Sequence, residues 1–262
     1  MKNSKSAGRS LLVGAAAATP LKRQGGYRPE IDIRGLTPFS TLDYPGKMAC
    51  IVFCAGCNLR CGYCQNPALV LDPESQPRIQ TEDVLDFLQC RQGKLDAVVV
   101  SGGEPTTHAG LPHFLTAVKA LGFMVRLDTN GTNLGMLKTC HRVGVLDALG
   151  IDYKAPKARY EEITASTSPV LRRNVSASIS FAIEQGIDLD IRTTVHRAFL
   201  SRDDLCAMRQ ELDSLGVGQW YLQQFHPVET IDDGLHEVPT YSDEEMLEIA
   251  ASLPNTTVRG EA

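Results

Sequence analysis

The chain has 262 residues, 43% of them hydrophobic, and a formal net charge of -5 at pH 7. A chain of this composition can bury one core of enzyme size, and no apolar run approaches the roughly 18 residues that a membrane-spanning helix needs. Because a nucleic-acid backbone and an anionic membrane surface both reward clustered Lys and Arg, the negative charge and the lack of a basic stripe argue against either as the main partner.

The N-terminal stretch through Tyr27 is predicted to be a disordered tail. Its basic residues precede the apolar run Leu11–Ala18, a weak resemblance to a secretory signal. We favour a tail because the apolar run is short, and because the clustered thiols further along would be oxidised in an exported protein. The sequence therefore predicts a tail followed by a single domain, residues 28–262, in the cytoplasm.

Beyond Gly35, short β-branched runs alternate with polar or Gly-rich segments and with stretches of helical periodicity, which is typical of βα units around a parallel sheet. The predicted strands are 48–53, 95–101, 123–129, 146–153, 189–195 and 220–225. The predicted helices are 81–91, 111–122, 134–144, 170–186, 201–216 and 242–253. Thr81 is expected to cap the first helix, several helices close on Gly, and Ser242 with Glu245 has the spacing of a capping box.

Six βα units with right-handed crossovers predict an α/β fold, either a partial (β/α)6 barrel or a doubly wound open sheet. In both architectures, ligands collect at the carboxyl ends of the strands. Those ends carry a Cys-rich loop, SGGEP (101–105), DTNG (128–131), DYK (152–154), RTTVH (192–196) and QFHP (224–227). Each of these alone could be an ordinary turn, but together they predict one binding site.

The segment ACIVFCAGCNLRCGYC (49–64) holds five of the eight cysteines and contains the spacing C-x3-C-x2-C twice. Such density favours metal ligation in a reducing compartment over disulfides, which could not all form without strain. Cys50 and Cys54 flank a stiff extended run, so their sulfurs lie about 13 Å apart and are expected to pack within a strand. Cys57, Cys61 and Cys64 lie in a segment that can coil, and they are the predicted metal ligands.

Three thiolates without a fourth nearby leave two kinds of metal site open. Zinc would require a fourth ligand, and the next histidine, His108, is far along the chain. A [4Fe-4S] cluster held by three cysteines leaves one iron free to take a chelating ligand. The isolated Cys90, Cys140 and Cys206 are expected to be buried small apolar residues.

The spacing of Cys57, Cys61 and Cys64, with Tyr63 before the last cysteine and GGEP following 38 positions later, resembles the radical S-adenosylmethionine (SAM) superfamily over roughly residues 35–230. The segments GLTPFSTLDYPGKMACIVFCAGCNLRCGYCQNP, SGGEPT, LDTNG, DYKAP and LQQFHPVET more narrowly resemble the activating proteins of glycyl-radical enzymes, most closely those of anaerobic ribonucleotide reductase. The resemblance implies a radical SAM partial barrel and a [4Fe-4S] cluster with an open iron, reduced by flavodoxin or ferredoxin. Cleavage of SAM would then give a 5′-deoxyadenosyl radical that takes a hydrogen atom from a glycine of a partner enzyme.

The resemblance also implies which residues contact SAM, and it requires no side chain to act as acid or base. Gly102 and Gly103 would let the main chain approach the methionine ammonium. Glu104 or nearby carbonyls would accept hydrogen bonds from that ammonium. The strand end at Asp128 and Thr129 would help to hold a monovalent cation. The predicted cofactor-binding residues are Tyr63 (through its backbone), Gly102, Gly103, Glu104, Pro105, Asp128, Thr129, Asn130, Asp152, Lys154, Arg192 and His226.

The sequence departs from the pattern of these activating proteins at Gln65, where many have His; Gln can form hydrogen bonds but does not titrate. No second cysteine-rich insert lies between Cys64 and Gly102, so a single cluster is expected. Three alternatives stay open. They are a radical SAM enzyme acting on a small molecule, similar to 7-carboxy-7-deazaguanine synthase, an activase of a pyruvate formate-lyase-type enzyme, and a non-catalytic zinc or iron-sulfur module.

Overall fold

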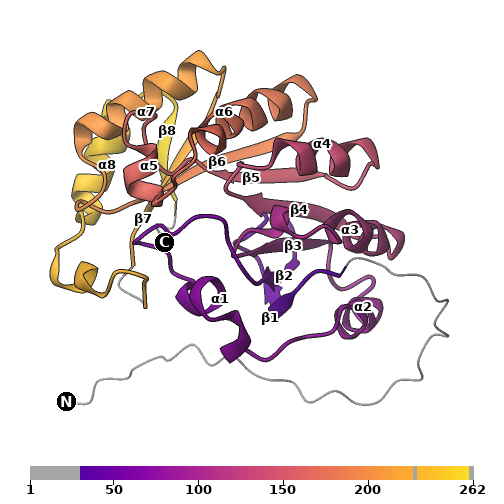
Figure 1. Ribbon diagram of the computed structural model, residues 1–262. Helices are drawn as coiled ribbons and strands as arrows, with labels where there is room; N and C mark the ends of the chain where they lie inside the picture. The colour runs from indigo at the N-terminus through magenta and orange to yellow at the C-terminus, as the bar shows by residue number, and fades with distance from the viewer. Residues whose placement is uncertain (1–29, 227–228, 260–262) are drawn as a thin grey trace, which may run out of the picture.

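The computed structural model describes residues 30–226 and 229–259, so the predicted tail through Tyr27 lies outside the described residues (Figure 1). One eight-stranded sheet runs through the described chain, with the strands in the order β1 to β8. The pair β1·β2 is antiparallel and all other neighbours are parallel. The strands are β1 Ile33–Ser40, β2 Ala49–Cys54, β3 Ala97–Gly102, β4 Met124–Thr129, β5 Ala148–Asp152, β6 Asp188–Val195, β7 Trp220–Gln224 and β8 Thr256–Arg259.

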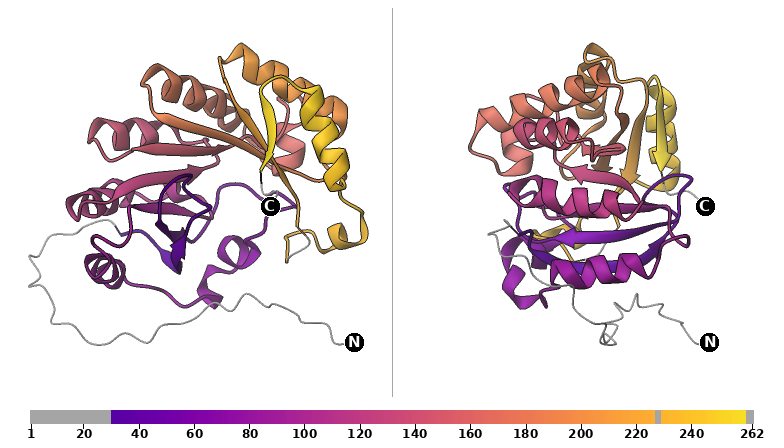
Figure 2. Two further views of the ribbon diagram at one scale, coloured as in Figure 1. Left: turned by 180° about the vertical axis from the view of Figure 1, so that it is seen from behind. Right: turned by 90° about the vertical axis from the view of Figure 1, so that its right-hand side faces the viewer.

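The six predicted strands are confirmed as β2 to β7, and their order decides between the two predicted architectures. A doubly wound sheet reverses its strand order at a switch point, whereas here each strand pairs with its sequence neighbours throughout. The sheet curls with its helices on the outer face, which gives the predicted open, partial barrel (Figure 2). The division into a tail and a single domain stays a prediction.

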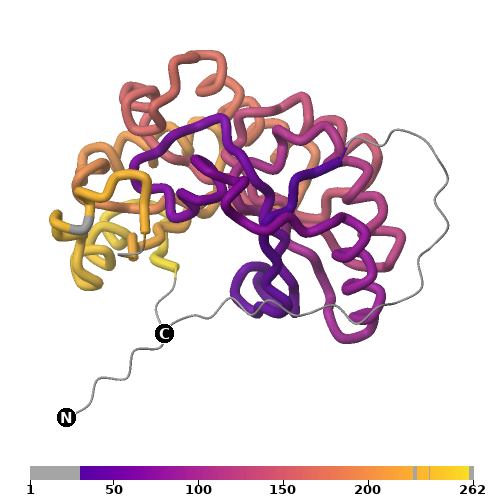
Figure 3. The backbone as a smooth tube through the Cα atoms, turned by 60° about the horizontal axis from the view of Figure 1, so that its bottom comes forward, coloured from indigo at the N-terminus to yellow at the C-terminus, as the bar shows by residue number. Residues whose placement is uncertain are grey.

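The two edge strands, β1 and β8, were not predicted. β1 contains Gly35 and Pro38, two residue types depleted in strands, and Pro is tolerated at a sheet edge because its missing N–H need not enter a ladder. The hairpin that joins β1 to β2 projects as the indigo loop at the bottom of Figure 3. It lies at the amino end of β2, opposite the end that carries the Cys-rich loop.

All six predicted helices are confirmed, with ends shifted by a few residues. The helices are α1 Pro67–Leu71, α2 Thr81–Gln89, α3 Leu111–Ala120, α4 Leu134–Arg142, α5 Tyr160–Thr164, α6 Pro169–Glu184, α7 Arg202–Ser214 and α8 Asp243–Ser252. The capping box of Ser242 and Glu245 is present, but Thr81 is the first residue of α2 and Gln80 stands at its N-cap. None of the described helices has the length and hydropathy that crossing a membrane requires.

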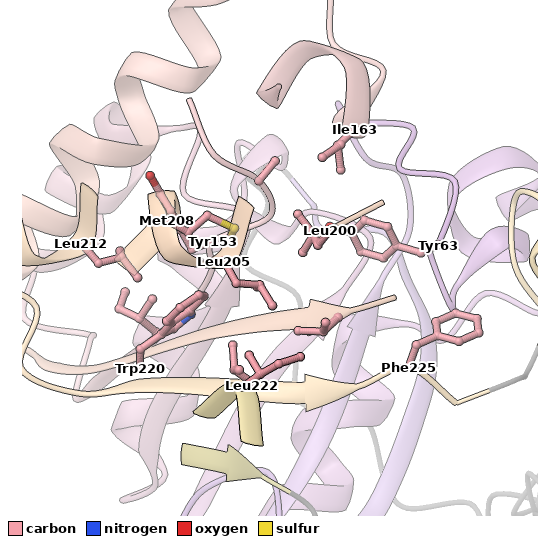
Figure 4. Packing of buried hydrophobic residues seen from close by; sticks show 14 of the residues in the cluster. Tyr63, Tyr153, Ile163, Leu200, Leu205, Met208, Leu212, Trp220, Leu222 and Phe225 are labelled. Carbon is pink, nitrogen blue, oxygen red and sulfur yellow. The ribbon is translucent and has the colours of Figure 1, made fainter. Parts of the chain in front are cut away.

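The helices pack on the outer face of the sheet through two clusters of buried apolar side chains. One joins β2 to β4 with α2 to α4, and it contains Cys50, Cys54 and Cys140, as predicted. The other joins β5 to β7 with α5 to α8 and includes Trp220 (Figure 4). The prediction that the isolated cysteines are buried is wrong for Cys90 and Cys206, which are exposed because one caps the end of α2 and the other lies on the outer face of α7.

Candidate active site

A pocket of about 140 Å³ lies at the carboxyl ends of β2 to β6. Of the predicted site residues, it is lined by Cys57, Cys61, Tyr63, Cys64, Gly102, Gly103, Asp128, Thr129, Asn130, Asp152 and Lys154. Five of the six predicted strand ends, those of β2 to β6, therefore meet in one place. Glu104, Pro105, Arg192 and His226 do not line the pocket, and the contacts of all these residues with a ligand stay predictions.

The Cys-rich loop that follows β2, residues 55–66, is held in place by main-chain hydrogen bonds to four separate segments. Gly56 N donates to Leu69 O (2.7 Å), and Gly56 O accepts from Glu104 N (2.7 Å). Arg60 N donates to Thr164 O of α5 (3.0 Å), and Gly62 O accepts from Asp232 N (2.9 Å). The loop thus has a fixed path, and that path turns all three cysteines toward one pocket.

The pocket lining offers three cysteine sulfurs as metal donors. Within residues 30–226 and 229–259, no three Cys, His, Asp or Glu side chains are close enough together to hold one metal ion. His108, the nearest histidine in sequence, is absent from the pocket lining, and its Nε2 lies 2.8 Å from Ala55 O. Three sulfur donors around a shared pocket, without a fourth Cys, fit a [4Fe-4S] cluster with one iron open to a further ligand.

The surroundings of Cys57 and Cys61 favour the protonated form of these two thiols in the metal-free protein. Burial raises the pKa of the Cys57 thiol to about 11. Burial also raises the pKa of Cys61, and the ammonium of Lys154 opposes this second shift. Metal binding requires the thiolates, so it must release these protons.

The glycines of the SGGEP segment allow β3 and the Cys-rich loop to touch. A Cβ on Gly103 would lie 1.9 Å from Gly56 O and 2.7 Å from Gly56 C, which are backbone atoms that cannot rotate away. Gly103 N donates to Cys54 O (2.8 Å) at the same crossing. From the sequence, Gly103 was expected to let the backbone approach a ligand. In the structure, Gly103 also lets β3 approach the Cys-rich loop.

Glu104 is fully buried and ties neighbouring loops together. Its carboxylate accepts hydrogen bonds from the backbone and hydroxyl of Thr106, from Thr129 Oγ1 (2.7 Å) and from Asn130 N (2.7 Å). Burial raises the pKa of Glu104, and these donors act against that shift. The side chain of Glu104 therefore holds the end of β4 to the end of β3. Gly102 and Gly103, which precede Glu104, form part of the pocket wall.

We expect Glu104→Gln to destabilise the metal-free protein by about 2–4 kcal/mol, because the new amide N–H group would face donors in a buried site. Chemical denaturation of the metal-free chain measures this loss, with Glu184→Gln at the exposed end of α6 as the matched control. Equal stability of the two variants would contradict the structural role of Glu104.

A row of alternating charges runs from the pocket across the inner face of the sheet, and we call it the ion-pair ladder. Its members, in order, are Lys154, Asp152, Arg192, Asp128, Arg126, Asp190 and Arg259, joined by N–O distances of 2.5–3.3 Å. Burial alone would raise the pKa of Asp152, but Arg192 and Lys154 lower it to about 2. The carboxyl group of Asp152 therefore stays ionised near neutral pH.

Sequence reasoning missed Arg126, Asp190 and Arg259 as members of this ladder. The sequence did hold a signal for Arg126 and Asp190. MVRLDT and LDIRTT each place two charged residues two positions apart, and therefore on one face of a strand that is otherwise buried. Gly150 on β5 lets Arg126 reach past that strand, because a Cβ there would lie 2.7 Å from Arg126 Nη2.

The ladder also bears on the monovalent cation that the resemblance implies. Both oxygens of Asp128 are bound by arginines, Nε of Arg126 and Nη2 of Arg192, at 2.9 Å. Asp152 is bound by Arg192 Nε (2.6 Å) and Lys154 Nζ (3.3 Å). Each oxygen of these two carboxylates thus has a cationic partner, and the monovalent cation at Asp128 and Thr129 stays a prediction.

The side chain of His226 is exposed, and its carbonyl accepts a hydrogen bond from Gln65 Nε2 (3.0 Å). Gln65 thus connects the Cys-rich loop to the end of β7 through a neutral hydrogen bond that does not depend on pH.

Comparison with known proteins completes the description of the site. The family model described as Radical SAM superfamily matches residues 51–195, more than half of the chain. A protein of Methanocaldococcus jannaschii named as a glycyl-radical enzyme activating enzyme is 26% identical over 223 residues, 83% of this chain and 89% of that protein. The 7-carboxy-7-deazaguanine synthase of Halobacterium salinarum is 31% identical over 149 residues, 55% of this chain and 52% of the synthase.

Two solved structures share the fold at low sequence identity. Streptococcus suis SuiB bound to S-adenosylmethionine has a TM-score of 0.59 at 15% identity, covering 78% of this chain. The alignment spans 48% of the SuiB chain, about half its length. Escherichia coli QueE has a TM-score of 0.50 at 17% identity, covering 88% of this chain and 94% of QueE.

Proposed function

The chain belongs to the radical SAM superfamily, whose enzymes use a [4Fe-4S] cluster and SAM, and we propose that it generates a glycyl radical on a partner enzyme. The observation that carries the proposal is the relative named as a glycyl-radical enzyme activating enzyme, which aligns over 89% of its own length. We propose anaerobic ribonucleotide reductase as the partner, from the resemblance of the motifs, with a pyruvate formate-lyase-type enzyme as the alternative. Flavodoxin or ferredoxin is the proposed reductant.

Cys57, Cys61 and Cys64 are the proposed cluster ligands, and SAM is proposed to lie between the open iron and the ends of β3 to β5. When bound, the reduced cluster supplies one electron that breaks a carbon–sulfur bond of SAM, which yields methionine and a 5′-deoxyadenosyl radical able to take a hydrogen atom from a glycine α-carbon. Nothing in this chemistry requires a protein acid or base.

The residues of this chain orient the cofactors and set the charge around them. Gly102 and Gly103 present backbone to the pocket, and the paired charges of Asp152 and Lys154 stand at its edge, suited to the charged groups of SAM. Lys154 Nζ lies 6.0 Å from the ring centroid of Tyr63, whose other neighbour is Phe199 at 5.4 Å. These aromatic rings keep water away from one side of the cysteines.

A small-molecule substrate, as in the 7-carboxy-7-deazaguanine synthases, is the second candidate, since such a synthase is among the relatives. We favour the activase because the relative named for that activity aligns over 89% of its own length, whereas the synthase aligns over 52%.

We expect deuterium to move from an α-deuterated glycine of the partner into 5′-deoxyadenosine. The experiment mixes the reconstituted protein with SAM, a reductant and deuterated anaerobic ribonucleotide reductase, and measures deuterium by mass spectrometry and the glycyl radical by electron paramagnetic resonance. SAM cleavage without a glycyl radical on either candidate partner would reject the activase. Formation of 7-carboxy-7-deazaguanine would support the small-molecule reading instead.

A further inference from the structure

Tyr160, the first residue of α5, carries a buried hydroxyl group that makes no hydrogen bond to any described residue. The residue is only 2% exposed. Buried polar groups nearly always have a partner, and leaving one without costs about 1–3 kcal/mol. The hydroxyl of Tyr160 therefore points to a partner that is not among the described residues.

The place of α5 in the fold indicates what that group is. Helix α5 rests directly on the Cys-rich loop, because Thr164 O accepts from Arg60 N (3.0 Å). Tyr160 and Ile163 belong to the same buried cluster as Cys61 and Tyr63. In Figure 4, Ile163 of α5 lies above Tyr63 of the Cys-rich loop. The helix that carries Tyr160 is thus packed against the loop that carries the proposed cluster ligands.

The direction of a hydrogen bond between Tyr160 and sulfur follows from the groups themselves. A neutral phenol carries one O–H donor, whereas a thiolate or a sulfide has no hydrogen to donate, so the bond must run from Tyr160 to the sulfur.

We infer that the Tyr160 hydroxyl donates a hydrogen bond to the sulfur shell of the [4Fe-4S] cluster, either the Cys61 thiolate or a cluster sulfide. The inference rests on the proposed function for the presence of the cluster. Reduction adds negative charge to the cluster, and hydrogen bonds to its sulfurs raise the reduction potential by stabilising that charge. Tyr160 therefore makes the cluster easier to reduce without touching SAM or the substrate.

The test compares Tyr160→Phe with Tyr153→Phe. Tyr153 is a matched control because it is equally buried in the same cluster of apolar residues, but its hydroxyl already donates to Glu211. In the metal-free protein, we expect Tyr160→Phe to unfold at a denaturant concentration no lower than that of the parent, since no hydrogen bond is lost and an unpaired buried hydroxyl is removed. Tyr153→Phe should unfold at a lower concentration.

After anaerobic reconstitution, both variants should bind as much iron as the parent. In Tyr160→Phe alone, the ratio of reduced to oxidised cluster at a fixed potential should fall about tenfold, which corresponds to a midpoint about 59 mV more negative for one electron. An unchanged midpoint, an equal shift in both variants, or loss of iron from Tyr160→Phe would overturn the inference. A parent that holds a redox-active cluster but forms no glycyl radical would reject the proposed function and leave this comparison valid, while a parent that binds no iron would reject both.

Discussion

Cys61→Ala is expected to abolish cluster assembly, and with it all cleavage of SAM. The substitution removes one of three sulfur donors that line the pocket. Cys54, the cysteine that precedes the triplet, cannot replace it, because Cys54 is fully buried within β2 and its backbone is fixed by Gly103 N. Iron and sulfide per chain after anaerobic reconstitution, and 5′-deoxyadenosine formed under dithionite, measure the two losses. Cys57→Ala and Cys64→Ala should behave in the same way.

Cys50→Ala is the matched control for these variants, since Cys50 lies on β2 among apolar side chains that face α2 and α3. It should keep the iron content and SAM cleavage of the parent. Loss of iron from Cys50→Ala would mean that the wrong one of the two overlapping cysteine triplets has been assigned. One equivalent of zinc in the parent, without SAM cleavage, would show that the site is a zinc module.

The sequence was most informative where local pattern and function coincide. The inner strands of a parallel sheet are apolar runs, and the polar segments that follow them had to meet at one edge, so β2 to β7 and most of the pocket lining could be predicted. β1 and β8 could not, because an edge strand may be short or contain Pro38 and still pair on one side. Helix α5 is only five residues long, too short to show a helical period.

Side-chain partners across the sheet were beyond sequence reasoning. Arg126 on β4 binds Asp190 on β6, so the pair depends on the register of three strands and on the absence of a side chain at Gly150 between them. Glu104 was expected at a ligand, and only the packing of the loops shows that its oxygens are already occupied by Thr129 and Asn130. Sequence patterns predict which polar side chains reach the end of a strand. They do not predict which of those side chains form hydrogen bonds or ion pairs with one another there.

Gly103→Ala is expected to separate β3 from the Cys-rich loop. The added Cβ would lie 1.9 Å from Gly56 O, and since this oxygen belongs to the main chain, the two segments must move apart. The movement would break the hydrogen bonds from Gly103 N to Cys54 O and from Glu104 N to Gly56 O. Two lost buried hydrogen bonds and the strain of overpacking together predict a destabilisation of about 3–5 kcal/mol.

The same displacement should reach the metal site, because Gly56 immediately precedes Cys57. We expect Gly103→Ala to bind at most about a tenth of the iron bound by the parent, at a temperature where the variant is still folded. Gly218→Ala is the control, since a Cβ there meets nothing within 4 Å, and its stability should change by less than about 0.5 kcal/mol. If Gly103→Ala retained full iron while losing stability, the cysteines would hold the cluster without support from β3. The contact between the two loops would then serve the fold alone.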